Sequence, residues 1–149
     1  MGLLAWLALC FGAAWFGSLF APGEWYESLV KPWWTPPNWI FGPVWALLYV
    51  LMAVAAWLVW RAHGFSGAPV ALGLFVGQLA LNAAWSWLFF GLERPGLALV
   101  GLVALWGALG GTMVAFWRLQ ALAGLLLAPY IIWVSFAAAL NYALWRLNT

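Results

Sequence analysis

Five long apolar runs divide the chain, and prolines and charged residues separate them. No charged residue falls in the middle of a run. About 20 consecutive apolar residues cross the hydrocarbon core of a membrane as a helix. Pro69 and Pro95 open two of the runs, where a helix tolerates proline because its first N–H groups have no partner. The pattern predicts an all-α protein with five transmembrane helices, at about residues 3–20, 43–61, 69–91, 95–117 and 122–145.

The connections between the runs differ in length. Three of them are short, at about residues 62–68, 92–94 and 118–121. Short connections make sequential helices antiparallel neighbours. The first connection, Ala21–Gly42, is long and rich in aromatic residues, and its prolines are Pro22, Pro32, Pro36 and Pro37. Long loops of this kind are seldom plain linkers, so we predict a lid that folds back over one end of the bundle; the alternative is an interfacial loop anchored by its tryptophans.

The third run has two distinct helical faces. Gln78, Asn82 and Trp85 share one face, and an amide in hydrocarbon is costly unless it is paired or faces a cavity. We therefore expect these amides to face the bundle interior. Small residues form a stripe on another face, and they are Gly73, Gly77, Ala80 and Ala84. Such a stripe lets another helix approach closely; a seam between two protomers and a contact within one bundle are both open.

A second stripe of small residues lies in the fourth run, and a contact within the bundle is favoured for it. Its members are Ala104, Gly107, Ala108, Gly111 and Ala115.

Aromatic residues cluster on one face of the second run and one face of the fifth. In the second run the face carries Trp45, Tyr49, Met52 and Ala56. In the fifth run it carries Tyr130, Trp133, Ala137 and Asn141. Pro129 is expected to break the hydrogen-bond ladder there and kink the helix. If these faces converge they form an apolar pocket with a few polar anchors, although periodicity alone favours ordinary aromatic packing.

Composition sets the class of protein. Hydrophobic residues make up 68% of the 149 residues and charged residues 5%. A soluble domain carries about 25% charged residues, so this chain cannot cover a water-facing surface. We predict a single multi-pass membrane domain over residues 1–149, with no room for a separate soluble domain. Five Lys and Arg residues are too sparse for a nucleic-acid surface, and their distribution over the loops does not decide the membrane orientation.

The reactive residues are few. The chain has no Asp, one Cys (Cys10) and one His (His63). Neither an internal disulfide nor a cysteine-rich metal site can be built from this set. A Ser-His-Asp triad is excluded as well, unless one of the three loop glutamates replaces the Asp. We expect no metal and no required cofactor, with Cys10 as a small buried hydrophobe and His63 as a solvated helix-end residue. Fifteen tryptophans exceed what the aromatic belts at the two membrane surfaces require, so we expect some of them to line a surface other than the membrane interface.

Three stretches resemble one known family. The loop contains Trp25-Tyr26, Lys31-Pro32 and Pro36-Pro37 before Pro43-Val44-Trp45; the third run reads Gln78 to Trp85, and the fifth reads Pro129-Tyr130 through Trp133 to Asn141. Together these motifs resemble the TspO/MBR family, the tryptophan-rich sensory proteins and translocator proteins also called peripheral-type benzodiazepine receptors. The resemblance covers essentially the whole chain. It implies a five-helix membrane bundle, often a homodimer, with a ligand cavity closed by the first loop.

The resemblance also implies ligands and site residues. Ligands of the family are porphyrins and other tetrapyrroles, sterols, and synthetic benzodiazepine-type or isoquinoline-type compounds. The implied ligand residues are Tyr26, Pro36, Trp45, Tyr49, Asn82, Trp85, Trp133 and Ala137. In some bacterial members light-dependent porphyrin degradation is attributed to the tryptophans that match Trp45 and Trp133.

The family's sterol motif is matched by Leu140, Tyr142 and Arg146. Motifs of this kind are weak. On a regular helix Tyr142 and Arg146 share a face and Leu140 points nearly opposite. An interfacial tyrosine with a snorkelling arginine is the favoured interpretation.

The leading hypothesis is a membrane receptor or transporter-like protein, resident in a bacterial cell membrane, that binds tetrapyrroles under the first loop, with Asn82 and Tyr26 orienting their polar groups. The runs contain no carboxylate, His or Lys to drive an ion-coupled pump. One alternative is an enzyme that degrades porphyrin in light, with Trp45 and Trp133 as electron donors on opposite walls. Another is a regulatory protein that acts through a partner and is switched by ligand.

Overall fold

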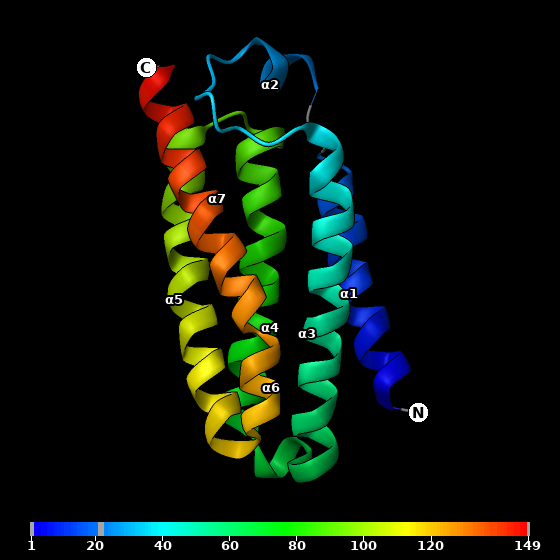
Figure 1. Ribbon diagram of the computed structural model, residues 1–149. Coiled ribbons are helices and arrows are strands. Elements are labelled where there is room, and N and C mark those ends of the chain that lie inside the picture. The colour runs from blue at the N-terminus through cyan, green and yellow to red at the C-terminus, as the bar shows by residue number, and fades with distance from the viewer. Residues whose placement is uncertain (1, 21–22, 149) are drawn as a thin grey trace.

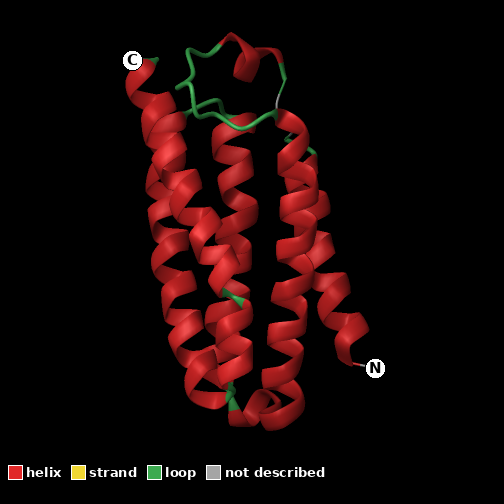
Figure 2. Cartoon of the chain, viewed as in Figure 1, coloured by secondary structure: helices red, strands yellow, loops and turns green. Residues whose placement is uncertain are grey.

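The computed structural model describes residues 2–20 and 23–148, and this part of the chain is helical with no strand (Figure 2). The elements are α1 (Gly2–Ser18), α2 (Glu24–Ser28), α3 (Asn38–Gly67), α4 (Pro69–Ser86) with the π-helical turn η1 (Trp87–Gly91), α5 (Pro95–Leu119), α6 (Ala121–Leu126) and α7 (Ala128–Leu147). Ala21 and Pro22 of the predicted loop lie outside the described residues.

Each predicted span corresponds to a helical segment. Four segments are long and apolar enough to cross a membrane, and they are Trp39–Gly67, Pro69–Gly91, Pro95–Leu119 and Ala121–Leu147. The remaining one, α1, is apolar and has 17 residues. Pro69 and Pro95 lie in the first turns of α4 and α5, as predicted. The all-α membrane architecture is therefore confirmed.

The start predicted for the second span is wrong, whereas its predicted end lies close to a break in the helix. Helix α3 begins at Asn38, and Pro43 lies inside it, where it removes one backbone hydrogen bond near the helix start. At the other end α3 continues through most of the predicted loop and is interrupted at Gly64, whose φ of 68° is readily adopted by glycine. Arg61 lies in the last turn before this interruption, with its guanidinium 5.0 Å from the Trp57 ring centroid.

The fifth span is broken where Pro129 predicts a kink. Helix α6 ends at Leu126 and α7 begins at Ala128. Pro129 occupies the first turn of α7, where its missing N–H costs nothing. The break lets α6 pack against α3 while α7 packs along α5.

The membrane helices form a closed ring. Helix α1 packs against α3 and α4, α4 against α5, and α5 against α6 and α7 (Figure 1). The core between them is apolar and aromatic; Phe75 and Phe116, for example, are fully buried and stack at 5.9 Å between ring centroids. Cys10 is buried in this core, as expected for a small hydrophobe. His63 is exposed, and its Nε2 lies 3.1 Å from the Leu119 carbonyl oxygen.

Residues 23–37, which connect to α3 and include α2, lie across the end of the bundle at which α7 ends (Figure 1). We call the described part of this connection, residues 23–37, the lid. Its side chains are anchored in the bundle, because Trp25 and Tyr26 pack on Phe89 and Phe90 of η1. Tyr26 is only 2% exposed. The prediction of a lid, as opposed to a loop anchored only at the membrane interface, is confirmed.

The two stripes of small residues have different surroundings. Gly73, Gly77 and Ala80 are exposed, and a Cβ built at Gly73 or Gly77 meets no described heavy atom within 4 Å. A contact within the bundle is therefore the wrong interpretation for these positions, although Ala84 is half-buried. In the fourth-span stripe a Cβ at Gly111 lies 3.7 Å from Leu74 of α4, which is the predicted internal contact.

That stripe is internal only in part, since Ala104 and Gly107 are exposed. A Cβ built at Gly107 meets no described heavy atom within 4 Å.

Gly77→Leu tests whether the outward stripe joins two protomers. We expect the variant to keep the stability of the wild type, because the added side chain meets open space within the chain. We also expect it to elute from mild detergent as a folded monomer where the wild type elutes as a dimer, because leucine prevents close helix approach. Gly12→Leu on α1 is the matched control, since its Cβ also meets nothing within 4 Å. If the Gly77→Leu protein elutes as the wild type does, the stripe does not join two protomers.

Candidate functional site: an aromatic cavity beneath the lid

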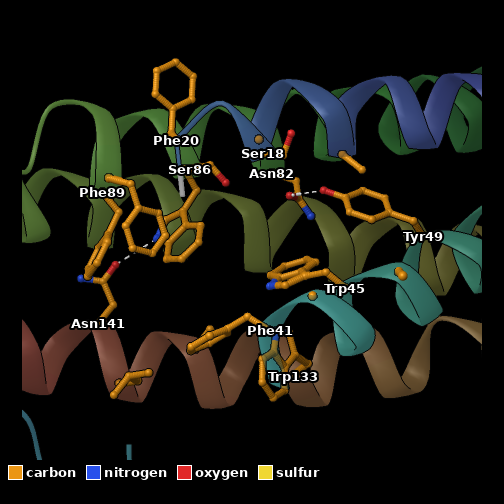
Figure 3. A pocket seen from close by; sticks show the side chains of 18 of the residues that line it. Ser18, Phe20, Phe41, Trp45, Tyr49, Asn82, Ser86, Phe89, Trp133 and Asn141 are labelled. Atoms are coloured by element: carbon orange, nitrogen blue, oxygen red, sulfur yellow. Dashed lines mark hydrogen bonds between the residues drawn. The ribbon is translucent and has the colours of Figure 1, made fainter. Parts of the chain in front are cut away.

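A cavity of about 310 Å³ lies beneath the lid, between α1, α3, α4 and α7 (Figure 3). Its walls are mainly aromatic, and its lining side chains carry no charge. The lining residues are Phe11, Ala14, Gly17, Ser18, Phe20, Tyr26, Phe41, Gly42, Trp45, Ala46, Tyr49, Asn82, Trp85, Ser86, Phe89, Phe90, Trp133, Ala137, Leu140, Asn141 and Leu144.

Nearly all of the ligand residues implied by the family resemblance converge on this cavity. Those that line it are Tyr26, Trp45, Tyr49, Asn82, Trp85, Trp133 and Ala137. Pro36 does not line it and is half-buried in the lid. The aromatic faces predicted for the second and fifth spans therefore do form a pocket, although Met52, Ala56 and Tyr130 of those faces lie deeper in the core.

The sterol motif is divided between two environments. Leu140 is 6% exposed and lines the cavity, whereas Tyr142 is 52% exposed on the outer surface. Arg146 is also on the surface, with its guanidinium 5.8 Å from the Trp145 ring centroid. The expectation that Leu140 points away from the other two residues is confirmed.

Trp45 of α3 and Trp133 of α7 touch each other. Their ring centroids are 6.4 Å apart with an interplanar angle of 87°, an edge-to-face contact (Figure 3). Phe41 packs edge-on against Trp133 at 5.9 Å and extends the same surface. The two tryptophans therefore form one continuous wall, and the expectation that they stand on opposite walls is wrong.

A chain of buried hydrogen bonds forms the floor. The Tyr49 hydroxyl donates to Asn82 Oδ1 at 2.9 Å, and Asn82 Nδ2 donates to the Tyr130 hydroxyl at 2.6 Å. The Tyr130 hydroxyl in turn donates to Gln78 Oε1 at 2.7 Å. Gln78 is fully buried and Asn82 is 3% exposed, so both predicted interior amides are confirmed. Because Asn82 is bonded through both its oxygen and its nitrogen, it is a structural link between α3, α4 and α7 more than an adjustable anchor.

A second polar link joins the cavity wall to the start of α5. Trp85 Nε1 donates to Asn141 Oδ1 at 3.0 Å, and Asn141 Nδ2 donates to the Pro95 carbonyl oxygen at 2.8 Å. Asn141 is 1% exposed. The indole of Trp85 also stacks on Phe89 at 5.4 Å, so its position is fixed from two sides.

Two polar groups of the lining have no hydrogen-bond partner among the described residues. They are the Tyr26 hydroxyl and Trp133 Nε1, and both atoms are buried. Burial raises the pKa of the Tyr26 phenol, so it remains a protonated donor at neutral pH. An indole N–H only donates. An unpartnered buried donor is costly, and both donors belong to residues that line the cavity.

Several lining residues were not predicted from the sequence. Phe11, Ala14 and Ser18 of α1 follow the i, i+3, i+7 spacing of one helical face, but α1 is apolar all round, so periodicity does not distinguish this face. Phe89 and Phe90 lie in η1, which turns adjacent phenylalanines toward the lid. The sequence signal that could have indicated these two residues is that they are adjacent phenylalanines next to the connection at residues 92–94.

Comparison with known proteins decides the family. The sequence model of the TspO/MBR family matches residues 6–146. The chain belongs to the TspO/MBR family. The human "Translocator protein" is 47% identical over 137 residues, covering 89% of this chain and 81% of the relative. The "Tryptophan-rich sensory protein" of Cereibacter sphaeroides is 42% identical over 145 residues, covering 97% and 90% respectively.

A further relative is "Protein CrtK" of Rhodobacter capsulatus, which is 43% identical over 143 residues. The match covers 93% of this chain and 86% of that protein. The family match includes the lid and at least part of every helix that lines the cavity.

Proposed function

We propose that this TspO/MBR protein is a membrane receptor or transporter-like protein that binds tetrapyrroles in the cavity beneath the lid. One observation carries the proposal: an apolar aromatic cavity contains two buried donors, Tyr26 OH and Trp133 Nε1, that have no partner among the described residues. Cavities of this makeup, apolar with a few placed polar groups, are typical of small-molecule sites.

The chemistry of a tetrapyrrole matches this lining. Its flat aromatic face can stack on one ring of the wall made by Trp45, Trp133 and Phe41 and meet the edges of its neighbours, because Trp45 and Phe41 lie at 87° and 69° to Trp133. Its carboxylates are acceptors for these two donors, which a ligand reaches once the lid or the rings around them move, because neither atom is exposed in the closed cavity. Lys31 is the cation beside the lid tyrosine, with its ammonium 4.8 Å from the Tyr26 ring centroid. Carbonyl groups of benzodiazepine-type or isoquinoline-type compounds would use the same donors.

The size of the cavity bears on how the ligand enters. Small-molecule sites occupy about 300–1,000 Å³, and about 310 Å³ lies at the lower end of that range. A macrocycle would therefore need the lid to move, or would extend past the closed lid. The charge-free lining offers no group to couple the movement to protons or ions, so any transport would be passive or a transfer to a partner.

Tyr26→Phe separates ligand binding from folding. The variant should be at least as stable as the wild type, because the hydroxyl that it removes is buried without a partner. Its affinity for carboxylate-bearing porphyrins should fall by about 0.5–1.5 kcal/mol, the net value of one hydrogen bond. Isothermal titration and thermal unfolding on the same preparation measure both effects. An alkyl porphyrin without carboxylates is the control and should bind both proteins equally; equal affinity for the acidic porphyrin as well would exclude Tyr26 as an anchor.

Light-dependent porphyrin degradation is the second candidate function. The edge-to-face contact of Trp45 and Trp133 favours it, because one ligand face would touch both potential electron donors. Absorbance of bound protoporphyrin under illumination, compared with a dark sample, distinguishes the two functions. A loss of absorbance that requires both tryptophans would support the enzyme, and a stable absorbance would support the receptor.

A further inference from the structure

The amide of Asn148, at the end of α7, pairs with the backbone of the lid. Asn148 Oδ1 accepts a hydrogen bond from the Val30 N–H at 2.9 Å, and Asn148 Nδ2 donates to the Val30 carbonyl oxygen at 2.9 Å. The same Nδ2 donates to the Leu144 carbonyl oxygen at 2.7 Å, which fixes the amide on its own helix. The side chain thus satisfies both backbone groups of one lid residue, as a neighbouring strand would.

The segment that Asn148 holds also carries the lid's donor into the cavity. Lys31 Nζ donates to the carbonyl oxygens of Glu27 and Leu29 at 3.1 and 3.3 Å. The same ammonium lies over the Tyr26 ring. Residues 26–31 are therefore one locally bonded unit, with Tyr26 facing the cavity at one end and Val30 paired to α7 at the other.

Aromatic ring contacts also join the lid to the helices. Trp25 and Tyr26 pack on Phe89, and Trp34 packs on Phe136 at 5.7 Å between ring centroids. Packed aromatic rings can rotate and slide against each other, whereas an amide that makes two hydrogen bonds fits its partner in only one position. Both partners of the pair are exposed, so water can replace it when the lid opens.

We propose that Asn148 is a positioning residue that holds the lid closed and sets how often the cavity opens. Its effect on ligand exchange rests on the proposed function, while its hold on the lid does not. Breaking the pair removes two hydrogen bonds from the closed state only, and the population of the open lid should rise about 5- to 30-fold.

Amide hydrogen exchange at Leu29, measured on the full chain in lipid nanodiscs, reads the opening of the lid, because the Leu29 N–H bonds to the Tyr26 carbonyl oxygen and not to Asn148. Asn148→Ala should speed exchange of the Leu29 N–H by about 5- to 30-fold. Asn148→Asp keeps an acceptor for the Val30 N–H but loses the donor, so its increase should be smaller. Val30→Ala is the matched control, because Val30 engages Asn148 only through its backbone, and the Leu29 N–H should exchange in it as in the wild type.

The second measurement is the dissociation rate of protoporphyrin, displaced by excess unlabelled ligand. It should rise in Asn148→Ala by a factor similar to that of the amide exchange and stay unchanged in Val30→Ala. Unchanged Leu29 exchange in Asn148→Ala would overturn the proposal that Asn148 holds the lid closed. Faster exchange with unchanged dissociation would overturn its control of the cavity. If the wild type binds no porphyrin, the proposed function fails, and the exchange rates alone decide whether Asn148 holds the lid.

Discussion

Trp133→Ala should raise the Kd for protoporphyrin by about 5- to 150-fold, equivalent to about 1–3 kcal/mol. The substitution removes half of the tryptophan wall and also one of the two unpartnered donors of the cavity. Both losses act on the bound ligand. Fluorescence titration and thermal unfolding on the same preparation separate an effect on affinity from an effect on folding.

Two further variants make this result specific. Trp15→Ala is the matched control, because Trp15 is 65% exposed on α1 and does not line the cavity, so its affinity should be that of the wild type. Trp133→Phe keeps an aromatic ring and loses the N–H, so its affinity should lie between those of the wild type and Trp133→Ala. Normal binding by a folded Trp133→Ala protein would place the ligand outside this cavity.

Tyr130→Phe should lower the free energy of unfolding by about 1–3 kcal/mol. The Tyr130 hydroxyl accepts from Asn82 and donates to Gln78 in a fully buried position. Its removal leaves both amides short of a partner in the membrane interior, where no water replaces it. Denaturant unfolding in a fixed detergent mixture is the measurement.

Tyr142→Phe is the control on the same helix. Tyr142 is 52% exposed on the outer surface, so the loss of its hydroxyl should change stability by less than about 0.5 kcal/mol. Equal stability of Tyr130→Phe and the wild type would mean that the floor network does not hold α4 and α7 together. A second consequence is expected at the cavity: because Asn82 lines it, Tyr130→Phe should also weaken ligand binding although Tyr130 is not a lining residue.

The spans and the interior amides could be predicted from the sequence because each rests on a strong physical cost. A charge or an unpaired amide in hydrocarbon is expensive, so apolar runs mark the helices and Gln78 and Asn82 mark the inner face. Pro129 marked the break between α6 and α7 for the same kind of reason, the absence of an N–H.

The start of α3 could not be predicted, because local signals conflict there. Pro43 resembles Pro69 and Pro95 as a first-turn proline, and it indicated a helix start at that position. Trp39, Ile40 and Phe41 continue the apolar pattern upstream, however, and the helix extends over them to Asn38. A helix tolerates proline near its start when the lost hydrogen bond is a single one.

Contacts between segments that are distant in the sequence could not be predicted from the pattern of apolar and polar residues. The contact of Trp45 with Trp133 depends on the rotation and spacing of α3 and α7, which no helical wheel contains. The pairing of Asn148 with Val30 joins residues 118 positions apart and uses the backbone of Val30, so side-chain identity at that position carries no signal. The contribution of α1 to the cavity was hidden because α1 is apolar on every side.

The most direct test of the account is an equilibrium titration of the purified protein in lipid nanodiscs with protoporphyrin, haem and coproporphyrin, followed by tryptophan fluorescence. Fifteen tryptophans give a strong signal. If tetrapyrroles bind in the cavity beneath the lid, quenching saturates with one tetrapyrrole per chain, the Kd rises in Trp133→Ala, and the Kd is unchanged in Trp15→Ala. Quenching that does not saturate with any of the three ligands, or the same Kd in all three proteins, would contradict a tetrapyrrole site in the cavity beneath the lid.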